Sequence, residues 1–224
     1  MRIALLHTAE SNIAIFDAAL ARCGLPGVSL LHALAPHLLA QAEAAGGLTP
    51  QIAARTADAL RAQAVGAQAV VLTCSTLGPA VAAAQDVGVP VLRADAALAA
   101  LVQRSGVPIA VLCAAPSTLA ATSALFAPPT CVTLVPGAWA AFKAGQLDHY
   151  YALIAEAAQA AGRHAASVAL AQVSMAPAAS LCRTVPVLTV PDAALHAAAS
   201  SGAAGGMREP PRSHHNSLPP GVIA

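Results

Sequence analysis

Short runs of β-branched residues and leucine recur along the chain and alternate with alanine-rich stretches of helical length. Such continuous apolar runs are typical of parallel strands that are buried on both faces of a sheet. The alternation therefore predicts an α/β layered fold with mainly parallel sheets. The predicted strands are Ile3–Leu6, Val28–Leu31, Ala69–Leu72, Val89–Leu92, Ile109–Leu112, Cys131–Val135, Val168–Leu170 and Val185–Val190, with helices including Thr49–Ala64, Pro79–Ala84 and His149–Ala161.

Three segments of the first half of the chain recur in the same order about 100 residues later. Such an ordered repeat predicts two related, pseudo-symmetric α/β halves, with a ligand cleft between them at the carboxyl ends of the strands. The matching pairs are Ile3–Ser11 with Ile109–Ser117, Val89–Arg93 with Val185–Thr189, and Val70–Leu77 with Val168–Met175. The last of these matches is loose, and it pairs Cys74 with Ser174 only if two residues are inserted in the second copy.

Composition narrows the possible partners to small neutral or anionic molecules. Eleven Lys and Arg residues give a formal charge of only +1, and aromatic residues are 3% of the chain, so nucleic-acid binding is not expected. Prolines interrupt the long uncharged stretch 105–142, so no membrane span is expected. The N-terminal apolar run before His7 is too short for a secretory signal.

The cysteine pattern favours a reducing compartment. Five cysteines without a CxxC pair argue against a disulfide framework and against a zinc site, so no metal is expected. The glycine- and proline-rich tail from Ser200 has the composition of a flexible segment, and its adjacent His214 and His215 are expected to be inert.

Cys74 is the strongest candidate for chemistry because it follows a buried strand within a run of small polar residues. Pro79 opens the predicted helix a few residues later, which would place the thiol near the positive end of a helix dipole and lower its pKa. The backbone N–H groups and hydroxyls of Ser75 and Thr76 would form a socket for a carboxylate. The alternative is that Cys74 is a small buried thiol without a function, as is expected of the other four.

Polar side chains also follow three other predicted strands. Ser174 would hydrogen-bond a ligand or cap a helix, because a serine needs an adjacent general base to act and the local sequence supplies none. Ser117 and Thr118 stand at another helix start, where capping and ligand contact use the same donors. His7 and Thr8 end the first strand, where His7 would orient a substrate or move a proton, or be structural.

The motifs of nucleotide-binding and hydrolase sites are absent. No GxGxxG follows the first strand, no glycine-rich loop ends in Gly-Lys-Ser/Thr, and Gly-x-Ser-x-Gly does not occur. No nucleotide cofactor is therefore expected.

Val70-Val-Leu-Thr-Cys-Ser-Thr76 resembles the first catalytic-cysteine motif of the aspartate/glutamate/hydantoin racemase superfamily, which includes arylmalonate decarboxylase and maleate isomerase. The resemblance covers about residues 1–195. It implies one half formed by 1–92 plus about 186–199, a second half formed by 93–185, and a flexible tail 200–224. The segments that fall where later family motifs lie are Val89–Arg93, Pro116–Thr118 and Ala171–Ala176.

The resemblance also implies roles for individual residues. In the family's racemases two cysteines flank the substrate α-carbon; Cys74 would be the first of them, and Ser174 stands where the second is expected. Cys182 lies too far along the chain to replace it. The substrate would be held by His7, Thr8, Ser75, Thr76, Ser117, Thr118 and Met175.

Three functions follow from this resemblance. The first is a cofactor-independent, cytoplasmic isomerase that exchanges the proton at the carbon α to a carboxylate or carbonyl of a small molecule, and the family suggests a homodimer. The second is a single-thiol decarboxylase or cis-trans isomerase of a small dicarboxylic acid, since decarboxylation needs only one proton donor. The third is a binding protein for small acids that has lost the chemistry together with the second cysteine.

Overall fold

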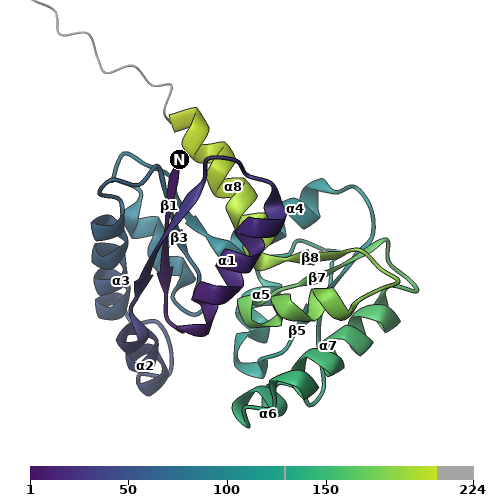
Figure 1. Ribbon diagram of the computed structural model, residues 1–224. Coiled ribbons are helices and arrows are strands. Elements are labelled where there is room, and N and C mark those ends of the chain that lie inside the picture. The colour runs from purple at the N-terminus through teal and green to yellow at the C-terminus, as the bar shows by residue number, and fades with distance from the viewer. Residues whose placement is uncertain (129, 206–224) are drawn as a thin grey trace, which may run out of the picture.

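The computed structural model describes residues 1–128 and 130–205, which form two four-stranded parallel sheets with helices around them (Figure 1). The first sheet has the order β2-β1-β3-β4, and the second has the order β6-β5-β7-β8. The strands of the first sheet are β1 (Arg2–His7), β2 (Ser29–Leu34), β3 (Ala69–Leu72) and β4 (Val91–Arg93). Those of the second are β5 (Ile109–Cys113), β6 (Val132–Leu134), β7 (Ser167–Leu170) and β8 (Val187–Thr189).

All eight predicted strands are present, and the predicted duplication is confirmed by the identical strand order of the two sheets. In each sheet the second strand in chain order lies on one side of the first strand, and the third and fourth strands lie on its other side. The switch points therefore lie between β1 and β3 and between β5 and β7. Ligands of open parallel sheets bind outside the carboxyl ends of the strands at such points.

Helices connect the strands and cover the sheets. In Figure 1, α2 and α3 lie on the outer side of the first sheet, α6 and α7 lie beside the second, and α1 and α8 lie between the two sheets. The α-helices are α1 (Ser11–Cys23), α2 (Pro36–Ala44), α3 (Pro50–Gln63), α4 (Ala94–Arg104), α5 (Leu119–Ser123), α6 (Ala138–Lys143), α7 (Leu147–Ala161) and α8 (Val190–Gly205). Three further segments are 3₁₀-helices: η1 (Gly78–Ala84), η2 (Pro116–Thr118) and η3 (Val173–Leu181).

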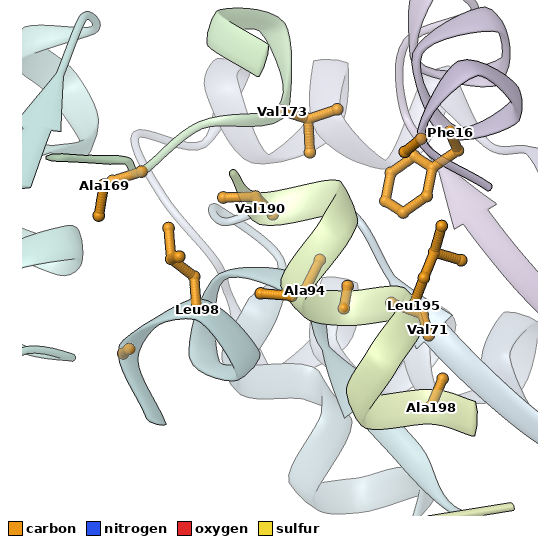
Figure 2. Close-up of a cluster of buried hydrophobic side chains, with 14 of the residues drawn as sticks. Phe16, Val71, Ala94, Leu98, Ala169, Val173, Val190, Leu195 and Ala198 are labelled. Atoms are coloured by element: carbon orange, nitrogen blue, oxygen red, sulfur yellow. The ribbon is translucent and has the colours of Figure 1, made fainter. Parts of the chain in front are cut away.

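One hydrophobic core is shared by the two halves. Phe16 and Val71 from the first half and Ala169 and Val173 from the second belong to the same buried cluster, and α8 contributes Leu195 (Figure 2). Each sheet also has a smaller core of its own on its outer side. The shared core fixes how the two halves face each other, because close-packed side chains resist relative displacement.

The expected boundaries differ from the structure at two places. β8 pairs with β7 in the second sheet, so the chain returns to the first half at Val190 and not at about residue 186. Residues 200–205, expected in the flexible tail, continue α8. The rest of that tail, 206–224, lies outside the described residues. Within the described part of the chain no helix is long and apolar enough to cross a membrane.

Candidate active site

Cys74 lies two residues beyond the end of β3, at the switch point of the first sheet. β3 pairs with β1 so that Leu72 is opposite Leu6, which brings the Cys74 loop next to His7 and Thr8. The Cys74 side chain is half-buried and packs against the outer core of this half. Ser75 and Thr76, both half-buried, follow it in a turn closed by the Gly78 N–H, which donates to the Ser75 carbonyl at 3.1 Å.

The helix that follows Cys74 is more tightly wound than the sequence suggested. Residues 78–84 form a seven-residue 3₁₀-helix that begins four residues after the thiol. A helix dipole acts mainly within the first turn of a helix, and Cys74 lies before that turn. What the segment offers a ligand is the pair of hydroxyls and the polar backbone of the turn.

His7 is fully buried at the end of β1 and belongs to a chain of hydrogen bonds. Its Nδ1 lies 2.9 Å from Thr73 Oγ1, and its Nε2 lies 2.9 Å from His32 Nδ1. His32 Nε2 in turn lies 3.1 Å from Asp17 Oδ1. Burial, and then the neighbouring His32, lower the pKa of His7 to about 4, so this imidazole is neutral at neutral pH. His7 holds the Cys74 loop through Thr73, and Thr8, next to it, is also buried.

Gln172 occupies the place in the second half that Cys74 occupies in the first. β5 pairs with β7 so that Leu112 is opposite Leu170, which repeats the pairing of Leu6 with Leu72. Counting two residues beyond each strand gives Cys74 in one half and Gln172 in the other. The equivalence that the sequence suggested, Cys74 with Ser174, is therefore displaced by two residues from the register of the sheets.

The Gln172 side chain fills the switch point of the second sheet. Its Oε1 accepts hydrogen bonds from the backbone N–H groups of Ala114 at 2.7 Å and Ala115 at 3.0 Å. Its Nε2 donates to Thr118 Oγ1 at 3.2 Å, and the buried Cys113 thiol donates to its Oε1 at 3.6 Å. A carboxamide oxygen thus occupies two backbone donors of the kind that bind carboxylates. Sequence reasoning missed Gln172, although it stands inside the segment that the motif comparison had singled out.

Ser174 is half-buried in the first turn of η3 and has a partner from a distant part of the chain. Its Oγ lies 2.9 Å from the hydroxyl of Tyr150, which is fully buried on α7. Burial raises the pKa of this phenol, so Tyr150 stays protonated, and either hydroxyl can donate the hydrogen bond to the other. The group beside Ser174 that the local sequence did not show is therefore a neutral hydroxyl and not a general base.

The three remaining predicted contacts, Ser117, Thr118 and Met175, lie in different surroundings. Ser117 is exposed in η2, whereas the Thr118 hydroxyl donates to the Ala115 carbonyl at 3.0 Å and accepts from Gln172. Met175 is fully buried in the core beside α7, so in this structure it supports η3 and does not face solvent. Its apolar side chain accounts for this, because the side of η3 that it occupies packs on the second sheet.

Arg93, which the sequence did not single out as a site residue, stands at the carboxyl end of β4. Its guanidinium donates two hydrogen bonds to the buried carboxylate of Asp95, at 3.0 and 2.8 Å, and lies directly over Gly78. This bidentate pair fixes the guanidinium beside the start of η1. The guanidinium can lie over residue 78 because glycine has no Cβ there. Comparison of the repeated sequence segments does not reveal this contact.

Three of the other four cysteines have a thiol that is enclosed or a poorer nucleophile than an ordinary thiol, and the fourth, Cys131, is exposed. Burial and the adjacent Asp192 raise the pKa of Cys23 to about 11, and burial raises the pKa of Cys182. Cys113 is fully buried. In residues 1–128 and 130–205 no group of three or more His, Cys, Asp or Glu side chains is arranged to hold a metal ion.

Two surface pockets lie away from these strand ends. One, of about 660 Å³, lies among α1, α4 and α8 and includes Arg22, Arg104 and His196. The other, of about 920 Å³, lies near the amino end of β5 and includes Pro108 and His164. Neither contains Cys74, and we locate the candidate site by the switch points of the sheets and by the polar groups gathered there.

Comparisons with known proteins agree on the fold. No protein-family model and no curated protein sequence matches the chain. Among solved structures, allantoin racemase from Pseudomonas fluorescens is 20% identical over the whole of both chains, with a TM-score of 0.66. Aspartate racemase from Picrophilus torridus is 12% identical over 92% of this chain and 94% of that one, with a TM-score of 0.66. Glutamate racemase from Thermus thermophilus is 18% identical over 93% and 83%, with a TM-score of 0.58.

These likenesses confirm the fold that the motif resemblance implied. The chain shares the fold of these racemase structures, with two pseudo-symmetric α/β halves. At identities of 12–20% the comparison establishes the architecture and leaves the reaction to be argued from the site.

Proposed function

We propose that the chain is a cofactor-independent enzyme that moves a proton at the carbon α to a carboxylate or carbonyl of a small molecule. The observation that carries this proposal is the position of Cys74, a half-buried thiol beyond β3 at the switch point of a racemase-type fold. Thiols of this kind act as bases when ionised and as acids when protonated.

Cys74 is the proposed proton carrier on the side of the first half. The substrate carboxylate would accept hydrogen bonds from Ser75 and Thr76 in the turn beyond the thiol. Donors in that position also stabilise the negative charge that develops on the carboxylate oxygens when the α-proton leaves. Thr8, at the neighbouring end of β1, is the proposed further contact on this side.

Ser174 is the proposed group on the side of the second half, supported by Tyr150. A neutral hydroxyl pair can deliver a proton or hydrogen-bond an oxyanion, but it removes an α-proton poorly because neither hydroxyl is basic. The two sides of the proposed site are therefore chemically unequal. Racemisation, which requires removal and return of a proton on both faces, would be slower than exchange on the Cys74 side.

The same inequality supports a second candidate, a decarboxylase or cis-trans isomerase of a small dicarboxylic acid. Loss of CO2 leaves a carbanion that needs a single proton, which the Cys74 thiol can supply. The observation that favours this reaction is Gln172 at the register position of Cys74, because a carboxamide neither gives nor takes a proton at neutral pH.

A panel of substrates in D2O, followed by proton NMR, tests the proposal. The panel contains aspartate, glutamate, hydantoins including allantoin, maleate and aryl-substituted malonates. Loss of a Cα–H signal is the result that the first candidate predicts, and optical rotation of the same sample measures inversion. Conversion of malonates or maleate alone would replace the first candidate by the second. If no compound is altered, we would abandon both in favour of a small-acid binding protein, for which saturation-transfer NMR on the same samples detects the bound compound.

A further inference from the structure

Four side chains in the first half form a continuous line of hydrogen bonds from solvent to the Cys74 loop. Asp17 on α1 is exposed over 59% of its side chain, His32 on β2 over 16%, and His7 is fully buried. The line ends at Thr73, which is buried and directly precedes Cys74. The three contacts measure 3.1, 2.9 and 2.9 Å from Asp17 inward.

The two imidazole rings are placed for a direct N–H···N hydrogen bond. Their planes differ by 19° and their centroids lie 5.2 Å apart, which fits two rings that are joined edge to edge through the 2.9 Å contact. Phe16 packs against His7 with its centroid at 5.5 Å, on the side of the shared core. The charged or titratable groups that act on His7 in the described part of the chain are His32 and Asp17.

The Thr73 hydroxyl has a choice of two acceptors. Its Oγ1 lies 2.9 Å from His7 Nδ1 and 3.1 Å from the Leu6 carbonyl, and its single proton can serve only one of them. The Leu6 carbonyl is satisfied in either case, because the Thr73 N–H also donates to it at 3.1 Å. The Asn12 amide lies 3.5 Å from the same hydroxyl oxygen, as a further long-range donor.

Two proton arrangements satisfy every contact along this line. In the first, Thr73 donates to His7, the Nε2–H of His7 donates to His32, and the Nε2–H of His32 donates to Asp17. In the second, His32 carries protons on both nitrogens, the Nδ1–H of His7 donates to Thr73, and Thr73 donates to the Leu6 carbonyl. The second arrangement holds one proton more than the first, and His7 is neutral in both.

We propose that Asp17, His32 and His7 form a proton relay between solvent and Thr73, in which His32 and Asp17 are positioning residues that set the tautomer of His7. When a proton arrives at Thr73 Oγ1, the former hydroxyl proton passes to His7 Nδ1. The His7 Nε2 proton then passes to His32 Nδ1, where Asp17 stabilises the imidazolium. One proton enters at Thr73 and one can leave from His32, so the count balances and no contact loses its hydrogen bond.

The relay has a consequence for catalysis, and this consequence rests on the proposed function. A site that removes an α-proton with one thiol must exchange that proton with solvent before the next turnover. The relay provides a proton outlet that begins at the residue directly before Cys74 and leads to solvent through the protein interior. Its tautomer exchange is a property of the protein without substrate and stands or falls independently of the reaction.

Long-range proton–nitrogen NMR of the histidine rings tests the relay directly in substrate-free, ¹⁵N-labelled protein. Between pH 8 and pH 5 we expect His7 to stay neutral and to change from the Nε2–H to the Nδ1–H tautomer. In Asp17→Asn the change should move to lower pH, since the imidazolium loses its counter-ion. In His32→Leu it should disappear, whereas His37→Gln, an exposed histidine on α2, should leave it unchanged.

A single His7 tautomer across this pH range would overturn the relay, as would a doubly protonated His7 above pH 5 or a tautomer change that ignores Asp17→Asn. For a substrate identified by the panel, the relay further predicts that Asp17→Asn shifts the pH profile of kcat while KM stays within about twofold. A tautomer change in a protein that converts no substrate would leave the relay standing and remove the proposed reaction.

Discussion

At the scale of single residues, the role of a polar group in this protein depends on its partner. The hydroxyl of Ser174 lies 2.9 Å from the buried phenol of Tyr150, so it belongs to a proton-donating pair. The carboxamide of Gln172 accepts from two backbone N–H groups and is neither an acid nor a base at neutral pH. Of these three side chains, only the Cys74 thiol has an acid form and a basic thiolate form.

Tyr150→Phe tests whether the phenol acts through Ser174. A neutral hydrogen bond of this kind contributes about 1 kcal/mol, so we expect kcat to fall about 3- to 10-fold with KM nearly unchanged. Tyr151→Phe, the next residue on α7, is the matched control because its hydroxyl does not contact Ser174. Equal losses in the two variants would show that packing of α7, and not the hydroxyl pair, matters.

His7 makes the stability of the fold depend on pH. Its pKa falls from 6.5 in the unfolded chain to about 4 in the folded protein, so between these values the unfolded state binds the extra proton. This stability is complete above pH 6.5 and is lost as the pH falls toward 4. The shift corresponds to on the order of 3 kcal/mol in the free energy of unfolding.

Urea unfolding at pH 7.5 and pH 4.5 measures this effect against His7→Gln. We expect the wild-type protein to lose more free energy of unfolding than the variant on acidification, although the variant starts from a lower value. A variant whose loss on acidification equals that of the wild type would refute the assignment to His7.

At the scale of elements, the sequence predicts the strands well and the short helices poorly. Continuous apolar runs such as Ala69–Leu72 identify buried parallel strands, because both faces of such strands need apolar side chains. The segment Gly78–Ala84 has the alanine content of an α-helix but forms a 3₁₀-helix under the Arg93 guanidinium. That outcome depends on packing against β4, which the helix propensity of the individual residues does not describe.

Gly78→Ala tests this packing. A Cβ at position 78 would overlap the Arg93 side chain, with Nη2 at 2.6 Å, and the salt bridge to Asp95 prevents the guanidinium from moving freely. We expect a loss of about 1–3 kcal/mol in the free energy of unfolding, measured by urea denaturation. In an Arg93→Ala background the same substitution should cost little. Equal costs in the two backgrounds would mean that Arg93 does not constrain η1.

At the scale of the whole molecule, the duplication predicted from sequence is present, and the match of Val70–Leu77 with Val168–Met175 agrees with the register of the two sheets. Pairing Cys74 with Ser174 required an insertion of two residues in the second copy, whereas counting from the strand ends without an insertion gives Gln172. The sequence alone does not show whether the loop after the strand contains such an insertion. Tyr150, His32 and Asp17 could not be predicted as partners, because tertiary packing alone brings them to the site.

Gln172→Cys tests the register at this scale. If Gln172 is the true equivalent of Cys74, a thiol there faces the substrate from the second half and frees the backbone N–H groups of Ala114 and Ala115. On a substrate that undergoes α-proton exchange, we expect the ratio of inversion to exchange to rise at least about 10-fold. Ser174→Cys is the comparison. A larger rise in Ser174→Cys would restore the pairing that the sequence suggested.

The proposed reaction depends on proton transfer by the Cys74 thiol. The most direct measurement is the rate of Cα–H exchange in D2O, by proton NMR, for Cys74→Ala beside the wild-type protein on the substrate that the panel identifies. Cys113→Ala is the control, since this buried thiol ends β5, at the position of the second half that corresponds to His7. We predict at least about a 100-fold slower exchange in Cys74→Ala and a change below about 3-fold in Cys113→Ala. Exchange at the wild-type rate in Cys74→Ala would contradict the account.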